Sequence, residues 1–169
     1  FHARSRDLRT WEVWAADGKW DAEGKPDTWE AVVSASDRLY DQCHNGDPSV
    51  VYKDGCYYLA YSATSRPDYR PADDHGEAAT LCCIMGAVSE DGIHWTKTDQ
   101  PLLIETEGAQ QSDGLTAGYM NFHRPSLHWE DERWRMRFDY WHPKLRATCM
   151  GCAENTGAFD SPGGFKPVH

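Results

Sequence analysis

Basic residues are scarce in this sequence, which has 17 Lys and Arg against 27 Asp and Glu and a formal net charge of −10 at pH 7. Nucleic-acid binding depends on phosphate contacts from a basic face, and docking to an anionic membrane depends on a basic cluster. The charge therefore argues against both kinds of partner. It is compatible with a neutral ligand such as a sugar.

Long apolar runs are also missing, since no stretch approaches the roughly 20 residues of a membrane-spanning helix. No signal peptide is visible, and the sequence opens on Phe1 rather than Met, so we expect a missing N-terminal part and leave the localisation open between cytoplasmic and secreted. The phosphate-binding loop, the dinucleotide fingerprint and the nucleophile elbow are absent too, which argues against nucleotide and esterase chemistry.

The six cysteines do not form a recognisable metal motif. Cys149 and Cys152 make one CxxC pair without a second, while Cys82 and Cys83 are adjacent. Neighbours on a strand point to opposite faces, so one strand does not easily aim both thiols at one ion. We expect buried free thiols and no cofactor, with a disulfide or a metal ion as the alternative.

Aromatic residues are plentiful instead, with eight Trp, eight Tyr and five Phe beside 14 Gly and nine Pro. This composition is typical of short strands joined by turns. A long repeat supports it, because residues 47–61 return without a gap as residues 124–138. Each copy reads as strand, acidic turn, strand.

A second element also recurs. Residues 85–92 match residues 150–157, and a Ser-x-Asp-x-x-x-Trp pattern occupies both residues 5–11 and residues 89–95. Four-stranded units repeating at this spacing indicate an all-β fold, a β-propeller of antiparallel blades. A β-sandwich with accidental similarity between its hairpins is the alternative.

The repeats divide the chain into about two full blades and the tail of a third. The predicted parts are closing strands of a preceding blade (1–11), a connecting segment (12–46), a first full blade (47–95), a connecting loop (96–123) and a second full blade (124–169). A single blade cannot bury its faces. We therefore expect further blades from the same parent chain, or blades of several chains combined as a homo-oligomer.

Three segments carry a family resemblance: HNGDPSVVYKDGCYYLAYSA (44–63), AVSEDGIHW (87–95) and SRDLRTW (5–11). They resemble the five-bladed β-propeller glycosidases, that is, the invertases and fructan hydrolases of glycoside hydrolase family 32 and the arabinanases and xylosidases of family 43. The resemblance implies a glycoside hydrolase acting on a plant or microbial glycan. In the resembling enzymes the first blade carries an Asp that acts as nucleophile or base. The resemblance implies that the strand with this Asp would lie before Phe1.

Glycoside hydrolysis needs paired carboxylates, and in a propeller these lie where the innermost strands enter the central funnel. Asp47 begins such a strand, and by analogy it is a base or a transition-state stabiliser. Arg124 begins the equivalent strand of the next blade, where the family pattern Arg-Asp-Pro is replaced by His123-Arg124-Pro125. We expect Asp47, His123 and Arg124 to be catalytic, with Arg124 beside Asp47 and keeping that carboxylate ionised.

Three further residues are candidate sugar-binding groups: His44 and Asn45 beside Asp47, and Trp141 as a stacking platform. A metal ion held by His44 and His123 is a further possibility. Glu105 and Glu107 are the candidate proton donors within the chain. The competing functions are a sugar-binding propeller without catalysis and a protein-interaction propeller.

Overall fold

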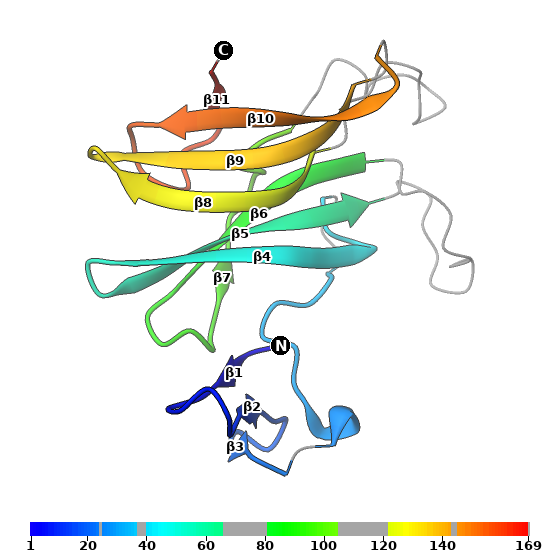
Figure 1. Ribbon diagram of the computed structural model, residues 1–169, viewed down its shortest axis with the longest axis vertical. Coiled ribbons are helices and arrows are strands. Elements are labelled where there is room, and N and C mark those ends of the chain that lie inside the picture. The colour runs from blue at the N-terminus through cyan, green and yellow to red at the C-terminus, as the bar shows by residue number, and fades with distance from the viewer. Residues whose placement is uncertain (24, 37–39, 66–80, 105–121, 143–144, 169) are drawn as a thin grey trace.

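The computed structural model describes residues 1–23, 25–36, 40–65, 81–104, 122–142 and 145–168. This part consists of three antiparallel sheets and one short 3-10 helix, η1 (Pro26–Thr28) (Figure 1). None of its helical structure is long and apolar enough to cross a bilayer. The all-β class expected from the sequence is confirmed.

Two four-stranded sheets make up most of the described chain. The first sheet contains β4 (His44–Lys53), β5 (Cys56–Ser65), β6 (Leu81–Ser89) and β7 (Thr96–Lys97). The second sheet contains β8 (Phe122–Glu130), β9 (Arg133–His142), β10 (Ala147–Asn155) and β11 (Lys166–Pro167). In each sheet, strands that follow one another in the chain are neighbours in space, as in a propeller blade.

The repeated hairpins have the same backbone turn. Asp54 and Gly55 join β4 to β5 with φ of 51° and 85°, and Asp131 and Glu132 join β8 to β9 with φ of 51° and 57°. Two central residues at positive φ match the right-handed twist of the flanking strands. The acidic turns predicted from the repeat are therefore equivalent in geometry.

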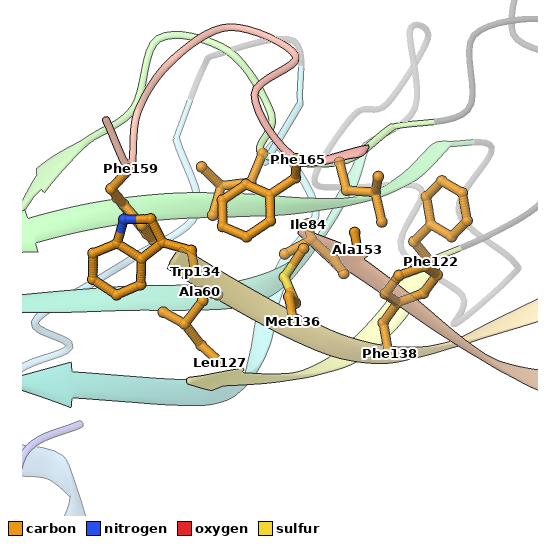
Figure 2. Close-up of a cluster of buried hydrophobic side chains, with 12 residues drawn as sticks. Ala60, Ile84, Phe122, Leu127, Trp134, Met136, Phe138, Ala153, Phe159 and Phe165 are labelled. Atoms are coloured by element: carbon orange, nitrogen blue, oxygen red, sulfur yellow. The ribbon is translucent and has the colours of Figure 1, made fainter. Parts of the chain in front are cut away.

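The two sheets pack face to face over one apolar core (Figure 2). Ile84 contributes from β6, Leu127 from β8, and Trp134 and Met136 from β9, and all four side chains are at most 3% exposed. Phe159 and Phe165, which follow β10, close one side of this core. Burial of this shared surface holds the sheets together.

The first sheet is buried on both faces, which explains the continuous apolar runs of β5 and β6. Ile84 faces the second sheet, whereas Cys83 and Met85 belong to a separate core cluster on the other face. Cys82 and Cys83 thus point to opposite faces, as predicted. None of the six cysteines, all of which are described, forms a disulfide, and both of these thiols are buried.

A small third sheet precedes the others and contains β1 (Ala3–Arg4), β2 (Glu12–Trp14) and β3 (Trp20–Asp21). It meets the first sheet where Nδ1 of His2 lies 2.7 Å from the carbonyl oxygen of Gly92. Assignment of residues 1–11 to a preceding blade remains a prediction.

Candidate functional site

β4 and β8 begin with the same irregularity. The pairing of β4 with β5 shifts between Gly46 and Ser49, and that of β8 with β9 shifts between His123 and Ser126. In each case two residues, the second a proline, stand opposite one residue of the partner strand, which is the geometry of a β-bulge. Proline suits this position because it has no N–H to donate to the ladder.

The residue before each proline has a left-handed backbone: φ is 49° at Asp47 and 50° at Arg124. Positive φ is uncommon for residues other than glycine and tends to occur at functional sites. Both side chains are exposed. The sequence repeat therefore extends to the backbone geometry of the bulges. The two bulges carry an acidic residue, Asp47, and a basic residue, Arg124, at equivalent positions.

Serine side chains of β4 and β5 fix β8 against the first sheet. Ser62 Oγ accepts a 2.8 Å hydrogen bond from the backbone N–H of Arg124, and Ser49 Oγ accepts a 2.9 Å bond from the N–H of Leu127. Ser62 is 1% exposed. The backbone at Arg124 is thus set by a buried neighbour, independently of the arginine side chain.

Arg124 makes its ion pair with a residue that was not among the candidates named from the sequence. Its Nη1 donates a 2.7 Å hydrogen bond to Oδ2 of Asp139 on β9, whose side chain is 16% exposed. This hydrogen bond and the charge of Asp139 raise the pKa of Arg124, and the charge of Asp47 adds to the effect. Asp47 lies within electrostatic range of Arg124, and Asp139 is the hydrogen-bonded partner.

His123 is half-buried beside these charges, and its Nδ1 lies 3.8 Å from Sγ of Cys82. Burial lowers the pKa of His123. The charge of Asp139 opposes this shift, and smaller effects come from Arg124, Asp47 and His44. At neutral pH the imidazole is therefore uncharged and able to donate or accept a proton.

Gly46 leaves room for His44 next to Asp47. A Cβ at Gly46 would lie 2.5 Å from Nε2 of His44, so the imidazole rests against the backbone of the bulge. We call the residues gathered here the strand-start cluster: His44, Asp47, Cys82, His123, Arg124 and Asp139. Among the residues that the structure describes, no three His, Cys, Asp or Glu side chains are arranged to hold a metal ion.

Asn45 does not join the cluster. Asn45 pairs with Ala63, whose side chain faces the core on the other side of the sheet, and its Nδ2 donates a 2.7 Å bond to the carbonyl of Ser34. It lines an apolar cavity of about 410 Å³ on that side. The backbone of Trp141 lies in β9, but its side chain and the whole of Glu105 and Glu107 are outside the described residues.

Asp139 and Cys82 are the cluster members that sequence reasoning missed. The repeat did contain a signal for Asp139, since it occupies the position of Ser62 in the second copy and therefore faces the bulge from the adjacent strand. Cys82 comes from the third strand of the other sheet. Only the packing of the two sheets reveals that it contacts His123.

No family model and no curated relative matches the chain, but several solved structures do. Sucrose-6-phosphate hydrolase from Lactobacillus gasseri is 15% identical, with a TM-score of 0.57 over 94% of this chain and 27% of that one. A family 43 β-xylosidase/α-arabinofuranosidase from a compost microbial metagenome is 17% identical, with a TM-score of 0.56 over 82% of this chain and 36% of that one. A family 117 glycoside hydrolase from the marine bacterium Zobellia galactanivorans is 17% identical, with a TM-score of 0.55 over 81% and 42%.

These likenesses, together with the repeated four-stranded sheets, decide the architecture. The two sheets are blades of a β-propeller. The chain spans less than half the length of the solved structures named above, so it corresponds to a part of each. β4 and β8 are the first strands of neighbouring blades, and they contact each other along the side from which the cluster is built.

Proposed function

We propose that the chain contributes two blades to a glycoside hydrolase and that the strand-start cluster is part of its active site. The observation that carries the proposal is the presence of two carboxylates, Asp47 and Asp139, around His123 and Arg124, near the starts of β4 and β8. Hydrolysis of a glycosidic bond requires paired acidic groups on either side of the bond. The structural neighbours, which are glycoside hydrolases by name, support the same reaction class.

The proposed roles follow from the environment of each group. Asp47 is exposed, which fits a base or a stabiliser of positive charge on the sugar ring. Asp139 is ion-paired to Arg124, so it fits charge stabilisation better than proton donation. His123 is the described group that best fits acid–base catalysis, because its imidazole is uncharged at neutral pH.

Arg124 favours a second candidate function, a sugar-binding propeller without catalysis. It stands where the resembling enzymes carry an Asp, and its guanidinium keeps donors free to bind sugar hydroxyls or a sugar carboxylate. In this alternative the same cluster binds a carbohydrate but does not cleave it. The carbohydrate ligand is common to both proposals.

The test is hydrolysis of a panel of aryl glycosides, with carbohydrate binding measured in parallel. We expect Asp47→Asn and Asp139→Asn each to lower turnover by about 10²–10⁴-fold, the range for loss of a positioned acid–base or charge-stabilising group. Asp54→Asn is the matched control, because Asp54 is an exposed carboxylate at the other end of β4.

The outcomes separate the two functions. Binding without turnover in the unmodified protein would favour the sugar-binding alternative. Full turnover in both cluster variants would exclude the strand-start cluster from the mechanism.

A further inference from the structure

Cys82 connects the two blades at the strand-start cluster. It lies on β6 of the first blade and is 3% exposed, and its Sγ is 3.8 Å from Nδ1 of His123 on β8 of the second blade. The contact is within the distance expected for a hydrogen bond that involves sulfur.

The thiol is protonated at neutral pH. Burial raises the pKa of Cys82 to about 12, and the nearby charge of Asp47 acts in the same direction. A thiol in this state is neither a nucleophile nor a metal ligand, since both roles require the thiolate. Its S–H group is a donor, and the matching acceptor is the unprotonated nitrogen of a neutral imidazole.

We propose that Cys82 is a positioning residue whose S–H donates to Nδ1 of His123 and thereby keeps the ring proton on Nε2. Donation to Nδ1 selects one of the two neutral tautomers and restrains rotation of the ring. If the proposed glycosidase function holds, His123 then presents an N–H donor to an oxygen of the carbohydrate. Only this consequence rests on the proposed function.

Other groups around His123 act on the charge of its ring through space. They are His44 and Asp47 on β4, Arg124 on β8 and Asp139 on β9. The two carboxylates favour the imidazolium, whereas Arg124 and His44 oppose it. The thiol differs from all four because it contacts one specific nitrogen of the ring.

Cys83 provides a matched control on the adjacent position. It is as buried as Cys82, but it faces the other side of β6, where its Sγ donates to the backbone oxygen of Tyr40 at 3.8 Å. Substitution of either cysteine by alanine removes the same atoms from the same strand. Only substitution of Cys82 removes a donor from His123.

The experiment is 15N NMR of the imidazole nitrogens in the full chain without carbohydrate, with His123→Gln used to assign the resonances. We expect the unmodified protein at pH 7.5 to show an unprotonated Nδ1 and a protonated Nε2. In Cys82→Ala both nitrogens should move toward averaged values, and the pKa of His123 should rise by about half a unit because a donor to the neutral form is lost. Cys83→Ala should leave both properties unchanged.

Two results would overturn the inference: a proton on Nδ1 in the unmodified protein, or the same His123 spectrum in Cys82→Ala as in the unmodified protein. Cys82→Val fills the space without an S–H donor and replaces Cys82→Ala if the alanine variant does not fold. Since no carbohydrate is present in the experiment, failure of the glycosidase proposal would leave the tautomer result intact.

Discussion

Arg124 interacts with two carboxylates, those of Asp47 and Asp139, and this arrangement of charges acts on His123. Its hydrogen bond goes to Asp139, while Asp47 acts on it only through space. Oδ1 of Asp139 is buried and accepts no hydrogen bond from the described residues. This carboxylate therefore depends on Arg124 for its compensation, and loss of the arginine leaves it largely uncompensated.

The electrostatic arrangement predicts opposite effects of two substitutions on His123. Arg124→Gln removes a positive charge and should raise the pKa of His123, whereas Asp139→Asn removes a negative charge and should lower it. Each change should be about half a unit to one unit. An NMR titration of the imidazole measures both, and a shift of the same sign in the two variants would contradict the arrangement.

At the scale of single elements, the Ser-x-Asp turn recurs almost atom for atom. Ser5 Oγ accepts from the N–H groups of Asp7 and Leu8 at 3.3 and 2.8 Å. Ser89 Oγ accepts from those of Asp91 and Gly92 at the same two distances. The residues around the two copies differ, however, since Ser89 and Gly92 are buried and Leu8 is 78% exposed.

This difference predicts unequal costs for one substitution. Ser89→Ala leaves the buried N–H of Gly92 without its acceptor and should lower the free energy of unfolding by about 1–2 kcal/mol. Ser5→Ala exposes its donors to water and should change it by less than about 0.5 kcal/mol. Urea unfolding measures both changes. Equal losses of unfolding free energy would mean that burial does not determine how much the turn contributes to stability.

The strand β7 is held by a buried ion pair. Nζ of Lys97 binds Oδ2 of Asp41, whose side chain is fully buried and also accepts a 2.5 Å hydrogen bond from Ser36. Removal of one partner of such a pair leaves an uncompensated charge inside the protein.

We therefore expect Lys97→Met to lower the free energy of unfolding by about 3–5 kcal/mol. Lys19→Met is the control, because the pair of Lys19 with Asp17 is exposed and should contribute less than about 1 kcal/mol. Thermal unfolding of the two variants compares them. Similar midpoints for both would show that Asp41 is compensated by other groups.

The sequence predicted the strands better than their surroundings. The repeat located both hairpins, because backbone turns and alternation are local properties. The shared Ser-x-Asp-x-x-x-Trp pattern does not extend to the surroundings of its tryptophan, since Trp11 is 48% exposed and Trp95 is half-buried. Trp95 instead donates from Nε1 to the carbonyl of Gly92 and packs against Tyr57 of its own sheet.

The site shows the same limit. Asp47 and Arg124 could be located because they hold equivalent positions near the starts of two repeated strands. The repeat also places Asp139 on the neighbouring strand, but its ion pair with Arg124 depends on side-chain directions that the bulge sets.

At the scale of the whole molecule, the two blades share one core and should unfold together. Met136 is fully buried in the cluster between them. Met136→Ala should lower the free energy of unfolding by about 2–5 kcal/mol. Met150→Ala, on a side chain that is 75% exposed, should change it by less than about 0.5 kcal/mol.

Amide hydrogen exchange distinguishes cooperative from separate unfolding. In Met136→Ala we expect exchange to accelerate in β5 of the first blade as well as in β9, although the substitution lies in β9. Acceleration confined to β9 and its neighbours β8 and β10 would indicate that each blade is stable on its own.

The twin bulges have a consequence for how such a protein changes over evolutionary time. The backbone at these two places is held by a proline, by the strand pairing and, at Arg124, by a buried serine, so the geometry of the bulge does not depend on the exposed side chain. After duplication of the blade, one copy could keep an acidic residue at the bulge and the other could acquire a basic residue, without loss of the architecture. The bulge of each blade is then a position where a single amino-acid substitution can reverse the sign of the charge, while the backbone fold is retained.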